Sequence, residues 1–190
     1  MAVLPIRMAG DPVLRQKAKK VRTIDESIHK LIDDMIETMR DAPGVGLAAN
    51  QVGVLLRVIV IEVPDEEEEE EVVDPEKPPV RQLHTLINPQ IVKRSGERRL
   101  DEGCLSIPGY KAATQRSINV TVKGLNREGK EVRIKAKDNL LAEVLEHEID
   151  HLNGILYIDH LESMDELVKL EEAGAPEDEV PSPAGGGSAA

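Results

Sequence analysis

Two histidines and a glutamate form the pattern with the clearest chemical meaning in this chain. The stretch "EHEIDHLNG" places His147 and His151 four residues apart, with Glu148 beside the first. This is the H-E-x-x-H pattern of metal-dependent hydrolases, in which two imidazoles on one helix face bind the metal and the glutamate is the general base. A catalytic metal site usually takes three protein ligands and leaves one position open. The third ligand must therefore lie elsewhere in the sequence.

Downstream residues fit poorly as the third ligand. The extended pattern H-E-x-x-H-x-x-G-x-x-H ends on a histidine, but here Gly154 is followed by Tyr157 at that position. His160 has an unmatched spacing, and we expect it to face solvent. Glu172 belongs to a C-terminal group of acids typical of solvated surface. A metalloprotease or other amidase with a downstream ligand is therefore the weaker interpretation.

The only cysteine, Cys104 in "DEGCLSIPG", is the strongest remaining ligand. A thiolate carries the charge that a metal prefers, and metal binding deprotonates the thiol. A lone cysteine is also often a buried structural residue. Gly103 and the following "LSIPG" favour the ligand, because they indicate irregular backbone that can bring N–H groups close to a bound molecule.

A helix must present the two histidines on one side. We expect it to begin after Asp138 or Asn139 as N-cap and to stop at Gly154. At about 100° per residue, the histidines and Glu148 share a buried face with aliphatic residues. Three acids fall on the opposite side or its edge: Glu143, Glu146 and Asp150.

Four further segments have regular hydrophobic patterns. Residues 23–40 predict an amphipathic helix with Thr23 and Glu26 as a capping box. "VLLRVIVIEV" predicts a largely buried strand, and "LHTLINPQIV" a strand with Pro89 at an edge or a bulge. "INVTVKGL" and "EVRIKA" alternate with period two around the turn "NREGK", which predicts an antiparallel hairpin.

The net charge of −12 is concentrated in two segments. Residues 65–77 carry −8 and residues 165–190 carry −6, so the rest of the chain sums to +2. We therefore expect one catalytic domain, 1–164, with a flexible acidic insertion at 65–79, and an acidic, mostly disordered tail at 165–190. Neither acidic segment can neutralise phosphates, so neither nucleic acid nor an anionic membrane is the expected partner.

The remaining composition limits the classes of function and the compartment. With no Phe or Trp and two Tyr, the chain lacks aromatic platforms for single-stranded nucleic acid. The lone cysteine cannot form an internal disulfide, and no run resembles a signal peptide or a span of about 20 apolar residues. A cytoplasmic setting is the expectation.

Three motifs together resemble the peptide deformylase family. They are "GVGLAANQVG" at 44–53, "EGCLS" at 102–106 and "HEIDH" at 147–151, and with the opening "GDPVLRQKAKKV" the likeness covers residues 5–162. With the expected elements, it implies an α+β fold with antiparallel or mixed β-sheets packed around a central H-E-x-x-H helix, and an N-terminal helix. The implied reaction removes the formyl group from N-terminal formylmethionine in a bacterial cytoplasm and releases formate.

The resemblance also implies roles for particular residues. Cys104, His147 and His151 would bind one divalent metal, most typically Fe(II), with zinc, nickel and cobalt as alternatives. Glu148 would carry the proton. The oxyanion donors would be the Gln51 side chain and the Leu105 backbone N–H, and Gly46 would let the substrate backbone approach. Arg116 and Asp150 would form a supporting pair between the helix and the strand region.

Partners and a non-enzymatic alternative follow from the same residues. The implied partners are N-terminal formylmethionyl peptides on translating ribosomes. The acidic tail stands where some family members carry a basic helix, which argues against docking on ribosomal RNA through the C-terminus. A structural metal protein or inactive relative is the second alternative. Intact Glu148 and Gln51 argue against it, because a structural site prefers four protein ligands and needs neither residue.

Overall fold

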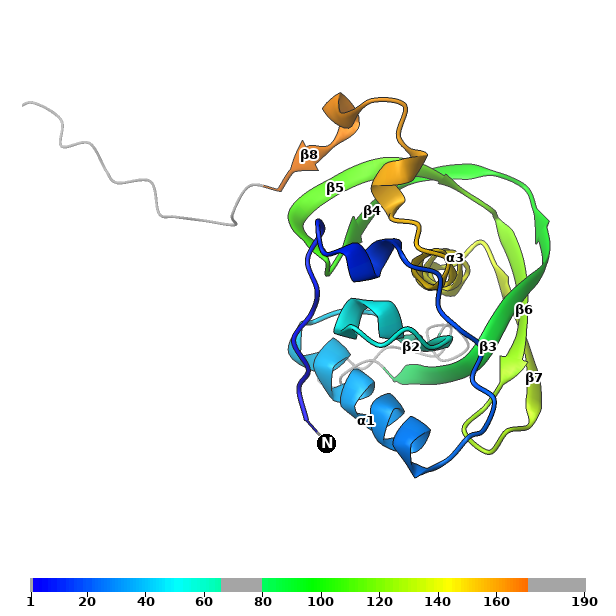
Figure 1. The fold of residues 1–190 in the computed structure, drawn as a ribbon. Coiled ribbons are helices and arrows are strands. Elements are labelled where there is room, and N and C mark those ends of the chain that lie inside the picture. The colour runs from blue at the N-terminus through cyan, green and yellow to red at the C-terminus, as the bar shows by residue number, and fades with distance from the viewer. Residues whose placement is uncertain (1, 66–79, 171–190) are drawn as a thin grey trace, which may run out of the picture.

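The computed structural model describes residues 2–65 and 80–170 (Figure 1). Most of the acidic insertion and of the tail predicted from the sequence therefore lies outside the described residues. Residues 165–170, which the sequence assigns to the tail, include the end of a 3-10 turn, Met164–Glu166, and the short strand β8, Val168–Lys169.

The fold is α+β, with two antiparallel sheets arranged around the helix α3, Leu140–Leu152. Figure 1 shows α3 end-on near the centre, with long strands curving around it. The larger sheet has the order β1-β2-β3-β6-β7, and its strands are Gly46–Ala48, Val58–Pro64, Arg81–Ser95, Asn119–Leu125 and Glu131–Lys137. The smaller sheet has the order β4-β5-β8 and begins with Arg98–Cys104 and Ile107–Arg116. The predicted fold class is confirmed.

The strand β2 is buried on both faces, which explains its unbroken apolar run. Ile59 and Ile61 pack in the cluster that contains α3, whereas Val58 and Val60 pack in the cluster that contains the N-terminal helix α1, Glu26–Asp41. A strand between two apolar layers needs no polar face, so it does not show the alternation of a half-exposed strand. Burial of these aliphatic side chains supplies the main driving force for folding.

The helix α1 begins later than predicted and has a different cap. Its N-cap is Asp25, whose carboxylate accepts hydrogen bonds from the backbone N–H groups of Ser27 and Ile28. The predicted capping box of Thr23 and Glu26 is therefore wrong. A cap at Thr23 or at Asp25 would each satisfy the unpaired N–H groups at the start of the helix. Both are common N-cap residues, so the sequence alone did not decide between them.

Pro89 occupies a bulge in β3, one of the two positions predicted for it. The register of β3 against β6 shifts between Ile87 and Gln90, and Asn88 has a φ of 54°. The pairing of β3 with β2 ends at Ile87, so Pro89 also lies just past the last residue that has a partner on that side. The hairpin predicted for the next two strands is also confirmed, since β6 and β7 pair antiparallel from Asn119↔Lys137 to Leu125↔Glu131.

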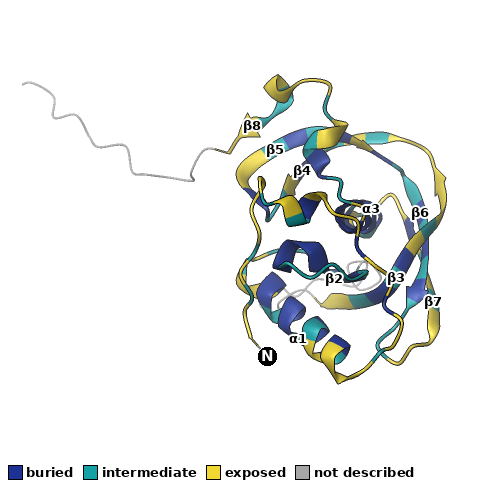
Figure 2. Cartoon of the chain, in the orientation of Figure 1, coloured by how far each residue is buried: buried dark blue, intermediate teal, exposed yellow. Residues whose placement is uncertain are grey.

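The helix α3 has the predicted N-cap but is buried on more sides than predicted. Asn139 accepts a hydrogen bond from the Ala142 N–H, and the helix ends before Gly154, which has a φ of 77°. Glu146 and Asp150, predicted on the opposite side or its edge, are buried, and Figure 2 shows the helix almost entirely in the buried colour. The strands surround α3, so its polar side faces protein and its acids need partners there.

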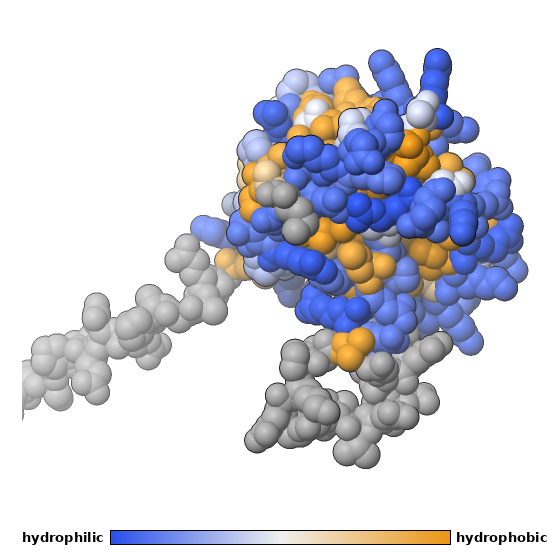
Figure 3. Space-filling view, turned by 90° about the horizontal axis from the view of Figure 1, so that it is seen from below, coloured by the Kyte–Doolittle hydropathy of each residue, from blue (hydrophilic) through white to orange (hydrophobic). Residues whose placement is uncertain are grey.

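The face of the molecule on the side of α1 is mainly polar. Seen from the side of α1, hydrophilic residues cover most of the face and hydrophobic ones lie in patches between them (Figure 3). None of the helices in the described residues is long and apolar enough to span a membrane.

Gly154→Ala should destabilise the protein strongly. A Cβ at this position would lie 2.6 Å from the Arg15 carbonyl oxygen, and the left-handed φ adds about 1–2 kcal/mol for any residue with a Cβ. Gly129→Ala is the matched control, because Gly129 has a φ of 75° but its Cβ would only reach ordinary contact, 3.5 Å from Ile24 Cδ1. Urea unfolding followed by circular dichroism should give a clearly larger loss for Gly154→Ala. Equal losses would mean that the backbone contact is not limiting.

Candidate active site

Three ligand atoms converge where β4 ends against α3. The Cys104 Sγ lies 3.2 Å from the His151 Nε2, and the His147 and His151 Nε2 atoms lie 3.1 Å apart. All three atoms fall within 4.8 Å of one another. Cys104 comes from the last position of β4, whereas the two histidines lie one helical turn apart on α3. The tertiary structure therefore brings together the three predicted ligands.

The chemistry of these atoms fits a metal. Burial, and to a lesser degree the charge of His147, holds the pKa of His151 well below its usual value, which keeps its imidazole neutral and able to donate a lone pair. Two imidazole nitrogens and a sulfur that face one another repel through their lone pairs unless a proton or a cation lies between them. A thiolate and two imidazoles suit zinc, iron, nickel and cobalt better than magnesium or calcium.

Glu102 supports the metal site and was not singled out from the sequence. Its carboxylate accepts a hydrogen bond from the His147 Nδ1, which leaves Nε2 to face the other ligands. Burial alone would raise the pKa of Glu102, but the hydrogen bonds from His147 and Arg116 outweigh it and hold that pKa well below the usual range. A carboxylate behind a histidine ligand fixes its tautomer and orientation. Glu102 lies two positions before Cys104, but the register of β4 against β5 shifts between Gly103 and Cys104, so strand spacing alone did not identify it.

Arg116 joins the smaller sheet to α3. Its Nε and Nη2 donate to Glu102 at 2.9 and 2.7 Å, and its Nη1 donates to the Asp150 Oδ2 at 2.6 Å. The predicted pair of Arg116 and Asp150 is thus confirmed. His160 is exposed, as predicted, and its Nε2 also lies 2.8 Å from the same Asp150 oxygen. The sequence did not reveal this contact, because it depends on the position of Asp150 on α3.

The Gln51 amide is held in one orientation. Its Oε1 accepts a hydrogen bond from the Ala48 N–H at 2.9 Å. Its Nε2 donates to the Ser106 Oγ at 3.2 Å and lies 3.6 Å from the Cys104 Sγ. The nitrogen end of the amide therefore faces the metal ligands. Ser106 was quoted within a motif but given no role from the sequence, since its contact with Gln51 depends on two distant segments.

Glu148 is buried beside the ligands and lacks a partner for one oxygen. Its Oε2 makes no hydrogen bond to any described residue. Burial raises its pKa to about 7, with the charge of His147 opposing the change, and a bound divalent cation would lower it again. Gly46 packs directly against it, because a Cβ there would collide with the Glu148 carboxylate and lie 2.6 Å from Val144. Gly46 therefore has no side chain because Glu148 occupies that space. The sequence predicted only that Gly46 lets the substrate backbone approach.

A cleft of about 640 Å³ opens onto this site. Its described walls come from the loop before β1, from β1, β4, β5 and α3, and from the residue after β8. Gly44, Val45 and Leu105 contribute an apolar part. β1 pairs with β2 on one side and has no other strand neighbour among the described residues, so one edge is open to an added strand.

The downstream residues that were weighed as ligands have other places. Tyr157 is buried with its ring stacked on His147, the ring centroids 6.4 Å apart. His160 contacts Asp150 instead of the metal ligands. Glu172 lies outside the described residues. Among the residues that the structure describes, the one group suited to a metal remains Cys104 with the two histidines.

The fold and this site define a metal-dependent hydrolase of the H-E-x-x-H class. The pattern of the family described as "Polypeptide deformylase" matches residues 3–167. The chain is 52% identical over 181 residues to the peptide deformylase of Dehalococcoides mccartyi (strain CBDB1), covering 95% of this chain and 97% of that protein. The chain belongs to the peptide deformylase family, and it is a deformylase enzyme.

Solved structures agree with the sequence relatives. The crystal structure of peptide deformylase from Ehrlichia chaffeensis in complex with actinonin has a TM-score of 0.76 and 42% identity, covering 87% of this chain and 92% of that one. A Met-Ala-Ser-bound class I type b peptide deformylase from Acinetobacter baumannii has a TM-score of 0.73 and 32% identity, covering 84% and 99%. Both likenesses cover more than four-fifths of this chain.

Glu102→Gln should weaken both metal binding and folding. The substitution removes the charge that pairs with Arg116, and losing one partner of a buried ion pair costs roughly 3 kcal/mol. It also removes the carboxylate behind His147, which typically lowers metal affinity about 10–100-fold. Urea unfolding and metal titration of the apoprotein measure the two effects.

Asp101→Asn is the matched control for this test. Asp101 is the neighbouring acid, and its exposed side chain pairs with Lys111 at the surface, where an ion pair contributes at most about 1 kcal/mol. If both variants keep wild-type metal affinity, Glu102 does not orient the ligand.

Proposed function

We propose that this enzyme removes the formyl group from the N-terminal formylmethionine of newly synthesised polypeptides and releases formate. The observation that carries the proposal is the convergence of Cys104, His147 and His151, with Glu148 beside them, at the base of a cleft walled by β1. Family membership supports the same reaction. Little space remains beside Glu148, next to Gly46 and the metal ligands. This space suits a small acyl group, such as formyl, at the end of a chain.

The substrate peptide adds to β1 as a further strand. The open edge of β1 offers backbone hydrogen bonds that are independent of the peptide sequence, as in other cases of strand addition. The apolar part of the cleft near Val45 and Leu105 receives the methionine side chain. Binding of Met-Ala-Ser by the relative from Acinetobacter baumannii is consistent with a tripeptide-sized site.

Cys104, His147 and His151 hold one divalent metal, and we propose Fe(II), with zinc, nickel and cobalt able to take the same ligands. When bound, the metal acts as a Lewis acid and lowers the pKa of a water molecule toward neutrality. Glu102 keeps the Nδ1 proton of His147 in place, so that Nε2 remains the donor atom. The apolar surroundings of Glu148 limit other water at the site.

Glu148 moves the proton. It accepts a proton from the attacking water and returns it to the nitrogen of the departing amine, so one carboxylate serves as base and then as acid. A bound cation favours the carboxylate that accepts the proton, and burial of Glu148 favours the neutral acid that returns it. The formyl C–N bond breaks, and the products are formate and a free N-terminal amine.

Gln51 and the Leu105 N–H stabilise the negative charge that develops on the formyl oxygen. The Gln51 Nε2 donates to the Ser106 Oγ and to the Cys104 Sγ, and the hydrogen on the Cys104 side is the one that would turn to the oxyanion. Because Ala48 fixes the opposite end of the amide, the donor needs no reorganisation during the reaction.

The biological setting rests on the same reaction. The substrates are formylmethionyl peptides leaving translating ribosomes. The relatives reported above come from bacteria. The cytoplasmic location stays a prediction from the sequence.

Anaerobically purified protein should release formate from a formylmethionyl tripeptide with about one metal bound per chain. Glu148→Gln should keep the metal and lose at least about 10²-fold in kcat, because it cannot move the proton. Cys104→Ala should lose the metal as well as the activity. Glu131→Gln, at an exposed position of β7 outside the cleft, is the control and should keep both. Internal cleavage of an unformylated peptide without formate release would instead indicate a protease.

Gln51→Leu and Gln51→Glu should each lower kcat by about 10²–10³ with metal content unchanged, because both lose the N–H donors. Gln51→Glu keeps an acceptor for the Ala48 N–H, so a shared loss identifies the missing donor and not the local fold. Steady-state formate assays provide the measurement. Wild-type kcat in Gln51→Glu would exclude this residue as an oxyanion donor.

A further inference from the structure

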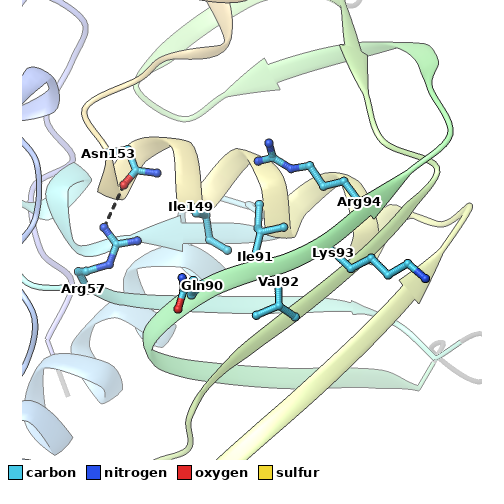
Figure 4. A pocket seen from close by; sticks show the side chains of 8 residues that line it. All are labelled: Arg57, Gln90, Ile91, Val92, Lys93, Arg94, Ile149 and Asn153. Carbon is cyan, nitrogen blue, oxygen red and sulfur yellow. Dashed lines mark hydrogen bonds between the residues drawn. The ribbon is translucent and has the colours of Figure 1, made fainter.

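A cation-lined groove of about 470 Å³ lies between β3 and α3, outside the active-site cleft (Figure 4). Its charged lining residues are Arg57, Lys93 and Arg94. The Arg57 guanidinium donates to the Leu152 carbonyl oxygen and to the Asn153 side chain. A cation at the C-terminal end of a helix satisfies the last carbonyl groups and complements the helix dipole. The fold itself therefore accounts for Arg57, and this groove indicates no ligand.

The active-site cleft has a wall to which the proposed reaction gives no role. We call it the β5–β8 wall, and it consists of Ile107, Pro108, Gly109 and Tyr110 on β5 and of Leu170 after β8. Tyr110 is 38% exposed and Leu170 is 46% exposed. Apolar side chains that remain accessible in a cleft beside a catalytic site are the usual contacts of a bound ligand. The wall is therefore a candidate for contact with the substrate beyond its methionine.

A bulge in β5 forms most of this wall. The register of β4 against β5 shifts next to Cys104, and residues 108–110 have no paired residue on β4. Gly109 at the centre of the bulge has a φ of 77°, a left-handed conformation that glycine adopts without strain. Bulges beside active sites redirect the strand and its side chains. Here the bulge places this stretch of β5 along the cleft.

The strand β8 pairs with the bulge from the other side of β5. Tyr110 pairs with Lys169, and the Leu170 N–H donates to the Gly109 carbonyl oxygen at 2.8 Å. The bulge is thus fixed by β8 and not by β4. The same hydrogen bond fixes the backbone of Leu170 at the edge of the cleft.

The turn before β8 is held on the same sheet. The Glu166 carboxylate accepts hydrogen bonds from the backbone N–H groups of Glu162 and Ser163, and it pairs with Arg99 of β4 at 3.1 Å. An exposed leucine on a loose chain end would need no explanation. Leu170 instead follows a segment that the smaller sheet holds at this turn and again at β8, so its side chain stays beside the cleft.

We propose that Leu170 is a specificity residue that contacts the side chain of the third residue of the substrate and favours an apolar residue there. The inference rests on the proposed function, in which the peptide adds to β1 as a strand and its methionine enters the apolar part of the cleft. Successive side chains of a strand point to opposite sides. The third side chain therefore points to the same side as the methionine, into the cleft, whereas the second points away from it.

Distances along the chain fit this assignment. In an extended peptide, the third Cα lies about 7 Å beyond the first. Ile107 pairs with the predicted ligand Cys104, and Gly109 lies two residues further, which is also at most about 7 Å. Because Leu170 is bonded to Gly109, it lies within reach of the third residue when the formyl group is at the metal ligands.

The charges of the cleft favour an apolar partner for Leu170. Away from the metal ligands its described acids are Asp101 and Glu143, and no lysine or arginine is among the described residues that line it. Asp101 pairs with Lys111, and Glu143 lies 3.9 Å from Arg98. The cleft therefore offers no cation to an acidic third residue, and its acids already have partners that compete with a basic one. Burial against Leu170 is then the main contribution at this position.

The test measures the binding of Met-Ala-Leu and of Met-Ala-Ala to the anaerobically purified full chain by isothermal titration calorimetry. Neither peptide carries a formyl group, so the result does not depend on turnover. Wild type should bind Met-Ala-Leu about tenfold more tightly than Met-Ala-Ala. Leu170→Ala should reduce this ratio about fivefold, because it removes most of the apolar surface that the third side chain contacts.

Val168→Ala is the matched control. Val168 lies on β8 two residues before Leu170 and is 52% exposed, but it is not among the residues that line the cleft. This variant should keep the wild-type ratio. Leu170→Glu makes the opposite change, because an acid at this position attracts a basic side chain. It should bind Met-Ala-Lys about threefold more tightly than wild type does.

The outcomes separate this inference from the catalytic proposal. A reduced ratio in Leu170→Ala alone, together with tighter binding of Met-Ala-Lys by Leu170→Glu, supports the role of Leu170. An unchanged ratio in Leu170→Ala, an equal reduction in Val168→Ala, or no preference between the two peptides in wild type overturns it. Formate release from the formylated peptides is measured in the same preparations. Its failure in wild type counts against the catalytic proposal, whereas the ratio of peptide affinities decides the role of Leu170.

Discussion

One buried arginine holds the two halves of the site together. Arg116 is 5% exposed and lies between Glu102 on the smaller sheet and Asp150 on α3. A planar guanidinium with several fixed donors can bridge two carboxylates at once, which the point charge of a lysine does not do in the same way. The two acids carry one more charge than Arg116 neutralises, and each also contacts an imidazole, Glu102 that of His147 and Asp150 that of His160.

This network matters for position more than for stability. Burying ions costs desolvation energy that their attraction roughly offsets, whereas the aliphatic clusters on both faces of β2 supply the driving force for folding. The metal ligands come from two elements, Cys104 from a strand and the histidines from a helix. Their separation must be held within a few tenths of an ångström for a metal to bind. The ion pairs of Arg116 with Glu102 and Asp150 connect β4 and β5 to α3 and so restrict the distance between Cys104 and the histidines.

The strands that surround α3 also determine which groups lie on the rest of the surface. Strands on one side of the helix leave the edge of β1 open beside the ligands, while β3, β6 and β7 curve around another side and carry exposed lysines and arginines. Chemistry and charge are thus presented by different elements of one fold. The net charge of the chain describes neither the apolar cleft nor the cation-lined groove, because electrostatic effects at these distances are local.

The sequence by itself determined the features that depend on local physics. The H-E-x-x-H spacing, the helical and strand periodicities, the hairpin and the Asn139 cap were all readable, because each depends on residues close along the chain. Ligand chemistry pointed to Cys104, the resemblance supported it, and the resemblance alone added Gln51. Only the tertiary structure decided that Glu102 and Ser106 join the site, that Glu146 and Asp150 are buried, and that Gly46 makes room for Glu148. Those features depend on which distant segments surround a residue, and a pattern of neighbours along the chain carries no information about that.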